Sequence, residues 1–291
     1  MATVIKSNVA YGGDVTLPSA VDLTYTAQAF YNEYAARVVA DGGRVVDPAA
    51  TLAAISWAKG AGVMGKIRAC GASWGVKESA GVITKMYGLG GEIYSPRGGG
   101  VELIESGAFP VIRSLSDTSY MVTDAPDKNI KTDSVGMFAC IDASFAGPTG
   151  WQAAVIDGVN STQSDIYLLQ TAGGNPSIFC SQDDGSFLSA AQTPKAAFSG
   201  FGGVAVPVLD NIYTSLDGVN GGSAAPTPPR TLADLKSAAT SRIMLFKRQF
   251  NGAPYGSPGT VPMTEFWLIN DCTEETASAI TGRLWNMYGT P

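Results

Sequence analysis

The spacing of apolar residues divides the chain into a helical part and a longer part with the periodicity of strands. Over Thr26–Asp41 apolar side chains recur at intervals of three and four, and Gly42-Gly43 ends the run, which predicts a helix. A second helix is predicted over Asp47–Gly60, because an aspartate N-cap followed by proline is a common helix start. A shorter third helical segment is predicted over Val63–Cys70.

From Val82 onward the apolar residues alternate, with turn-forming residues at short intervals. A series of many short strands is typical of a β-sandwich or jelly roll. The Gly- and Pro-rich stretch Asp217–Arg230 is predicted to be a loop, and Thr273 is predicted to cap one final helix. The predicted strands are Val82–Tyr87, Val101–Glu105, Ser119–Val122, Val135–Asp142, Trp151–Asp157, Ile166–Gln170, Ser177–Cys180, Ala196–Phe198, Val204–Leu216, Arg242–Arg248 and Thr264–Ile269.

Composition narrows the classes of function that the chain can have. Charged residues make up only 15% of the chain, and the formal net charge of −6 leaves no basic surface for nucleic acid. Histidine is absent, which excludes Ser-His-Asp triads, Cys-His dyads and His-ligated zinc. No window is apolar enough to span a membrane, and Met1–Tyr11 lacks the pattern of a signal peptide.

Three segments resemble the concanavalin A-like, laminin-G-like (LamG) sandwich of bacteriophage virion proteins. Residues 263–289 (MTEFWLINDCTEET followed by a helix ending WNMYG) look like the closing strand and terminal helix of that family. Residues 242–254 (RIMLFKRQFNGAP) are similar to its penultimate strand and Asn-Gly loop. Residues 82–91 (VITKMYGLGG) look like its opening segment, with Gly88 standing where the family has aspartate.

The resemblance implies a mainly β fold: a jelly-roll β-sandwich with a small N-terminal helical unit and a C-terminal helix. The expected organisation is an extended N-terminal arm over 1–25, a small helical docking unit over 26–80, and a sandwich closed by the C-terminal helix over 81–291. The function implied is a non-enzymatic structural component of a phage virion, associated with the tail as a fibre or adhesin. A capsid decoration or head-fibre protein is the first alternative, and a lectin-like carbohydrate-binding module is the second.

The same resemblance sets the expected partners and location. The arm is expected to dock on other virion proteins, and the sandwich to face cell-surface polysaccharide. Repeated copies are expected, with a trimer favoured. The expected location is the virion, after synthesis in the host cytoplasm. The four cysteines are expected to be buried thiols, with a disulfide formed late in the released particle as the alternative.

Glycan binding is the candidate chemistry that the aromatic residues allow. Sugars have apolar faces and polar edges, so their sites combine aromatic platforms with polar groups. Four aromatic residues lie at predicted strand ends or in loops, where such platforms can sit, although packing is the commoner role of an aromatic residue in a sandwich. The candidate glycan-binding residues are Trp151, Tyr167, Tyr213 and Tyr255.

Neither a cofactor nor a catalytic residue is expected. Glu102 and Glu105 are three positions apart and would point to opposite faces of a strand, so they make a poor pair for glycoside hydrolysis, which is the most distant alternative. Calcium is the alternative to an absence of metal, with Asp183, Asp184 and Asp217 as weak candidate ligands. Asp-Gly pairs of this kind are turn formers first.

Overall fold

The computed structural model describes a defined subset of the chain. It covers residues 25–116, 118–126, 130, 134–142, 150–157, 165–172, 175–181, 187–191, 198–206, 211–225, 241–250, 253–255 and 262–289. The predicted N-terminal arm lies outside the described residues, apart from Tyr25. The described residues form a mainly β fold of antiparallel strands with three α-helices.

Each of the three helices begins directly after a capping residue, and two of these caps, Asp47 and Thr273, are predicted from the sequence. The helices are α1 (Ala27–Ala40), α2 (Pro48–Gly60) and α3 (Glu274–Tyr288). Thr26 accepts a hydrogen bond from the backbone N of Ala29, Asp47 accepts from Ala49 and Ala50, and Thr273 accepts from Thr276. None of these helices, in the part of the chain that is described, is both long and apolar enough to cross a membrane.

The predicted third helical segment, Val63–Cys70, is wrong beyond its first turn. Met64–Lys66 forms a single 3-10 turn, and Ile67–Gly71 is a strand, β2. This strand pairs along its whole length with β20 (Met263–Asn270), about 200 residues further along the chain. Apolar residues buried on both faces of a strand lack the alternation that would have identified it.

The strands form two packed layers, which we call the central sheet and the outer sheet. Pairing gives the central sheet the order β16 (Val219–Ala224), β15 (Asn211–Leu216), β14 (Phe198–Val206), β9 (Val135–Asp142), β20 and β2. The outer sheet has the order β13 (Phe187–Ala191), β12 (Asn175–Ser181), β11 (Asp165–Ala172), β10 (Gly150–Asp157), β17 (Ser241–Leu245), β8 (Tyr120–Thr123), β5 (Ile93–Arg97), β4 (Val82–Tyr87), β3 (Gly75–Ser79) and β1 (Arg44–Val45). Two strands join the layers, β6 (Val101–Ile104) and β7 (Val111–Ser114), and β18 (Arg248–Phe250) with β19 (Ala253–Tyr255) forms a separate hairpin.

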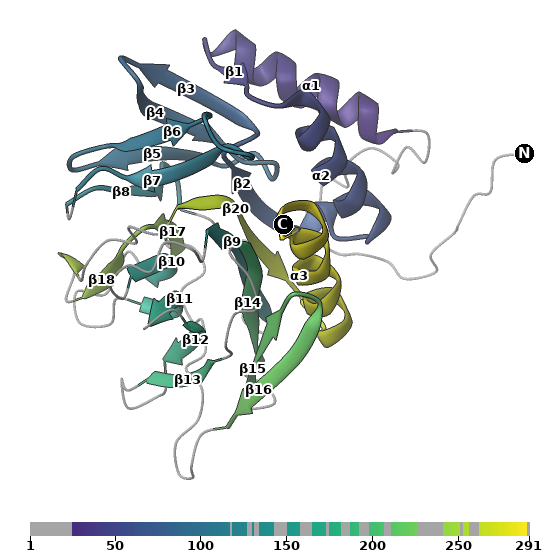
Figure 1. Ribbon diagram of the computed structural model, residues 1–291, viewed down its shortest axis with the longest axis vertical. Helices are drawn as coiled ribbons and strands as arrows, with labels where there is room; N and C mark the ends of the chain where they lie inside the picture. Colours follow the sequence, from purple (N-terminus) through teal and green to yellow (C-terminus); the bar gives the residue numbers. More distant parts are fainter. Residues whose placement is uncertain are drawn as a thin grey trace, which may run out of the picture.

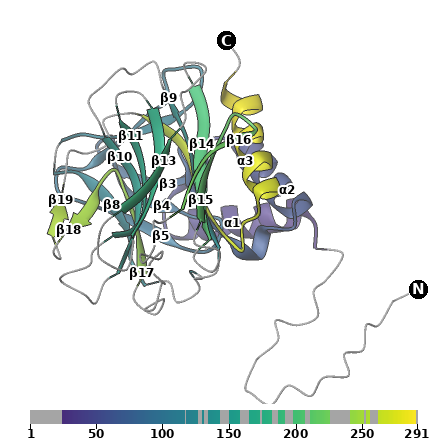
Figure 2. The ribbon, with the colours of Figure 1, turned by 90° about the horizontal axis from the view of Figure 1, so that it is seen from below.

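Strand β20 of the central sheet is buried on both faces. Phe266 and Leu268 of β20 pack into the core between the two sheets. Trp267 and Ile269, which alternate with them, pack into a second core beneath the helices. Figure 2 shows the three helices together on one side of the strands, and Figure 1 shows α3 lying along β14, β15 and β16. All four cysteines are buried and none of them forms a disulfide, which confirms the prediction of buried thiols.

Three boundaries differ from those predicted. Strands β1, β2 and β3 belong to the two sheets, so sheet structure begins well before residue 81. The single strand predicted over Val204–Leu216 is two strands, because Val206 of β14 pairs with Asn211 of β15 in an antiparallel ladder. The predicted loop Asp217–Arg230 contains strand β16. It follows a turn in which Asp217 and Gly218 both have positive φ, the geometry that suits a tight hairpin.

Candidate functional site

The loop Gly88–Glu92 joins β4 to β5 and is tied to the neighbouring strand β2. The backbone N of Gly88 donates to the carbonyl of Glu92 at 2.8 Å, and the N of Leu89 donates to the carbonyl of Ala69 at 2.9 Å. In return, the Glu92 carboxylate accepts a 2.6 Å bond from the N of Ala69. These bonds hold the loop in one conformation against the scaffold.

The loop needs glycine at three of its positions. A Cβ at Gly88 would lie 2.1 Å from the Glu92 carboxyl carbon, and a Cβ at Gly90 would lie 2.4 Å from the carbonyl oxygen of Ile67. Gly91 has φ of +96°, a conformation that side chains disfavour. A side chain at position 88 would therefore clash with Glu92, which supplies the carboxylate in this loop.

Two surface hollows flank this loop, and Gly91 lines both of them. The α1 hollow has a volume of about 340 Å³ and lies between α1 and the loop. The β8 hollow has a volume of about 270 Å³ and lies between the loop and the end of β8. The α1 hollow is lined by Phe30, Glu33, Tyr34, Arg37, Leu89, Gly90 and Gly91. The β8 hollow is lined by Arg68, Gly91, Glu92, Ile93, Thr123, Asp124, Ala125, Pro126 and Ile243.

Tyr34 and Arg37 build the helix side of the α1 hollow. The Tyr34 hydroxyl donates to the carbonyl of Tyr87 at 2.7 Å and accepts from the N of Gly75 at 2.8 Å, and burial raises its pKa well above the ordinary value. Arg37 lies over the Tyr34 ring, with 5.4 Å from Cζ to the ring centroid, and donates to the carbonyl of Gly88 at 2.8 Å. The guanidinium is therefore fixed at the edge of the hollow.

The β8 hollow has an apolar floor and a rigid polar rim. Ile93 and Ile243 supply the apolar surface. The Arg242 guanidinium donates to the carbonyls of Thr123 and Asp124, at 2.6 and 2.7 Å, and holds the rim in place. An apolar floor with convergent polar groups is the usual composition of a small-molecule binding site.

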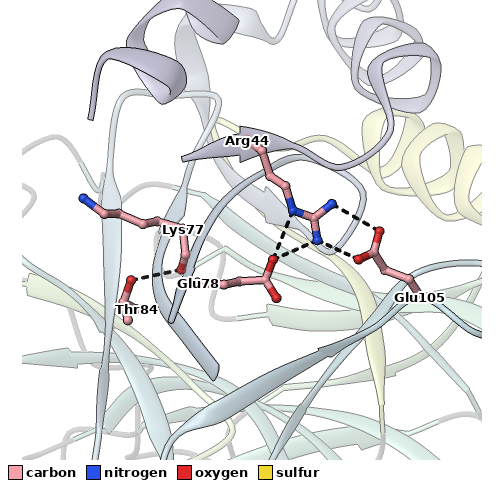
Figure 3. Close-up of polar contacts among 5 residues, drawn as sticks. All are labelled: Arg44, Lys77, Glu78, Thr84 and Glu105. Carbon is pink, nitrogen blue, oxygen red and sulfur yellow. Dashed lines mark hydrogen bonds and ion pairs between the residues drawn. The ribbon is translucent and has the colours of Figure 1, made fainter. Parts of the chain in front are cut away.

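Three carboxylates outside the loop are bound to arginines. Glu78 and Glu105 share the Arg44 guanidinium, as Figure 3 shows, with closest N–O distances of 2.8 and 2.6 Å. Glu102 pairs with Arg113, so Glu102 and Glu105 have different partners. No group of three metal-ligating side chains occurs within the described residues.

The structure places the four predicted aromatic platforms on strands β10, β11, β15 and β19. Tyr213 lies in β15 with 6% of its surface exposed, so its prediction as a glycan platform is wrong: the ring is part of the core beneath the helices. Trp151, Tyr167 and Tyr255 occupy positions in β10, β11 and β19, and their role as platforms stays a prediction. None of the four is among the described residues that line the hollows.

The structure describes one of the three weak metal candidates, Asp217. Asp183 and Asp184 lie outside the described residues. Asp217 forms part of the hairpin turn before β16, and its carboxylate accepts a 3.2 Å hydrogen bond from the N of Gly200. Its observed role is to hold a turn, as expected of an Asp-Gly pair.

Sequence reasoning missed the residues that build the hollows, notably Phe30, Arg37, Arg68 and Glu92. The available signal was the cluster of three glycines at positions 88, 90 and 91, which marks a close approach of backbone to other groups. The partners in that approach come from α1, β2 and β8, and local sequence does not show which elements will meet there.

Comparison with known proteins shows likeness of fold alone. No protein-family model matches the chain, and no curated protein matches it. A crystal structure of a tryptophan-to-alanine mutant of HCR/D is 12% identical with a TM-score of 0.50, over 75% of this chain and 52% of that chain. A phenylalanine-to-alanine mutant of HCR/D is 10% identical with a TM-score of 0.50, over 75% and 51% of the two chains. The chain thus spans about half the length of these structures.

A third structure of similar fold was solved with a bound sugar. It is the ligand binding domain of botulinum neurotoxin serotype D in complex with N-acetylneuraminic acid, 11% identical with a TM-score of 0.49, over 77% of this chain and 52% of that chain. The bound sugar is a property of the neurotoxin domain.

Proposed function

We propose that this chain is a non-enzymatic carbohydrate-binding β-sandwich that a bacteriophage particle displays toward the cell surface. The observation that carries the proposal is the pair of hollows around the Gly88–Glu92 loop. Both are built on residues that hydrogen bonds fix to helices and strands, so the binding surface is formed before a ligand arrives.

The composition of the hollows suits a sugar. Phe30 is a partly exposed aromatic ring at the α1 hollow, and aromatic surface packs well on the apolar face of a pyranose. Arg37 and Glu33 stand beside it, and Arg68 and Asp124 stand at the β8 hollow. Guanidinium and carboxylate groups can donate to and accept from the hydroxyls on the edge of a sugar ring.

Binding without catalysis is favoured by the chemistry that the chain holds. The sequence contains no histidine, and Glu78, Glu102, Glu105 and Glu265 each have an arginine partner. The hydrogen bond from Arg44 lowers the pKa of Glu105, and a carboxylate that stays ionised makes a poor general acid.

Display on a virion rests on the sequence resemblance to phage proteins with a LamG-like sandwich. In this proposal the residues before α1 dock on other virion proteins, and the chain is present in repeated copies, with a trimer favoured. A tail position is proposed ahead of a position on the capsid. Immunogold labelling of intact particles with antibody against the sandwich would distinguish tail from head.

The test of the binding function is a glycan array probed with the full chain, followed by titration of the strongest glycan against two variants. Phe30→Ala and Arg37→Gln should each weaken binding about fivefold, because each removes one contact worth about 1 kcal/mol. Arg97→Ala is the control, since Arg97 is exposed on β5 and donates to its own neighbour's carbonyl. Unchanged affinity in both variants would place the glycan elsewhere, and an array without any signal would overturn the function.

A further inference from the structure

The two hollows have one lining residue in common, Gly91, which has no side chain. We infer that they are two subsites of a single site, filled by one elongated oligosaccharide of neutral or mixed charge that crosses the loop at Gly91. This inference rests on the proposed function and specifies its class of ligand.

Size is the first argument for a ligand that spans both hollows. The range for ligand pockets is ~300 to 1,000 Å³. The β8 hollow, at about 270 Å³, lies just below its lower end, and the α1 hollow, at about 340 Å³, lies just above it. Taken together they fall inside that range. A ligand confined to one hollow would bury little surface, whereas one that spans both would gain contacts without a second loss of translational freedom.

The path between the hollows is the second argument. Gly91 is exposed and lines both hollows, so the ligand would cross backbone only. A Cβ added at Gly91 would stand 3.4 Å from the nearest nitrogen of Arg37, which places that guanidinium beside the crossing point. On the other side, Arg68 approaches within 3.2 Å of the Cβ position of Gly90. The two arginines therefore bracket the glycine crossing.

Charge sets the class of ligand. The lining contains two arginines, Arg37 and Arg68, and three carboxylates, those of Glu33, Glu92 and Asp124. Both guanidiniums already donate to backbone carbonyls, those of Gly88 and Ile67. A polyanionic glycan would meet more negative than positive charge here, whereas hydroxyl groups can use both kinds of group.

The test is a calorimetric titration of the full chain with oligosaccharide ladders of one to six units. The probes are ladders of neutral glucose and galactose oligomers. Oligogalacturonates of the same lengths are the polyanionic counterpart of the galactose ladder. We expect the Kd for a neutral ladder to fall at least about tenfold between one unit and four, and then to level off once both hollows are filled. Oligogalacturonates should bind more weakly than the neutral galactose ladder.

Two variants assign the subsites. Phe30→Ala alters the α1 hollow and Asp124→Ala alters the β8 hollow. Each variant should raise the Kd for the longest neutral probe and reduce the dependence of Kd on probe length. The Arg97→Ala control should keep the full dependence. An affinity that is equal for one unit and for six, tighter binding of oligogalacturonates, or no binding of either neutral ladder would overturn the inference. Each of these results leaves the proposed function standing if the glycan array gives a signal that Phe30→Ala or Arg37→Gln removes.

Discussion

Two clusters in the molecule contain the same kind of ion pair, between arginine and glutamate, but one is buried and the other is exposed. Glu265 on β20 is fully buried and accepts four hydrogen bonds, two from Arg283, one from Trp267 and one from Tyr288. Arg44 on β1 bridges Glu78 and Glu105 at the surface, where its side chain and that of Glu105 are each 47% exposed (Figure 3). Both clusters join distant elements, but only the first is closed to water.

The difference in burial indicates which of the two clusters contributes more to stability, and this is the Glu265 cluster, which joins α3 to the central sheet. The Glu265 cluster lies beneath α3, and Arg283 also stacks against Trp267, with 5.2 Å from Cζ to the ring centroid. Burial, together with the Glu265 charge, raises the pKa of Tyr288 well above its ordinary value. Water cannot replace a partner lost from this cluster, whereas it can replace one at Arg44.

The largest predicted effect is the loss of Arg283. Arg283→Met removes the cation and leaves the Glu265 charge buried with hydrogen bonds from Trp267 and Tyr288 alone. The free energy of unfolding should fall by about 3 to 5 kcal/mol. Urea denaturation followed by tryptophan fluorescence measures this change.

A double variant sharpens that prediction. Glu265→Gln combined with Arg283→Met removes both charges and keeps an acceptor for Trp267 and Tyr288. It should be more stable than Arg283→Met alone, because the uncompensated charge is gone. A double variant that is less stable than the single variant would mean that the buried charge does not dominate the cost.

The matching change in the exposed cluster should have a much smaller effect. Arg44→Ala removes both ion pairs of Figure 3 and should lower the free energy of unfolding by about 1 kcal/mol or less, since exposed pairs are screened by water. The difference from wild type should shrink further in 0.5 M salt, in urea titrations at both ionic strengths. A loss as large as that of Arg283→Met would break the comparison.

The smallest predicted effect is a dependence on pH at the end of α1. Hydrogen bonds from Lys85 and Tyr87 lower the pKa of Asp41 from 3.8 to about 2. Because the folded pKa is depressed, Asp41 contributes stability above pH 4, and this contribution is lost as the pH falls from about 4 to 2. Wild type and Asp41→Asn should therefore differ in urea midpoint at pH 5 and converge by about pH 2. A constant difference across that window would contradict the assignment.

Local signals in the sequence were enough to place several elements. The caps Asp47 and Thr273 were found because each cap depends on a few adjacent residues. Strands β4 and β9 have the bounds that were predicted for them, Val82–Tyr87 and Val135–Asp142. Strand β2 was not found, since its pairing with β20 is set by a partner far away in sequence.

The site could be predicted only in part, for a related reason. The glycines at positions 88, 90 and 91 can be read from the sequence. The groups that require two of them to be glycine, Glu92 at Gly88 and Ile67 at Gly90, are brought close only by the fold. Tyr213 was predicted to be a surface platform because it lies near a turn, yet its ring faces the core beneath the helices. A strand position fixes which face a residue occupies, and burial of that face depends on what covers it.

The central claim is that the Gly88–Glu92 loop organises a glycan-binding surface, and one matched pair of variants tests it directly. Gly90→Ala places a methyl group 2.4 Å from the carbonyl oxygen of Ile67, whereas Gly60→Ala, at the end of α2, meets nothing within 4 Å. Both variants are to be titrated with the strongest glycan from the array. The account predicts that Gly90→Ala, still folded by circular dichroism, loses binding at least about tenfold while Gly60→Ala binds like wild type. Equal binding by the two folded variants would contradict it.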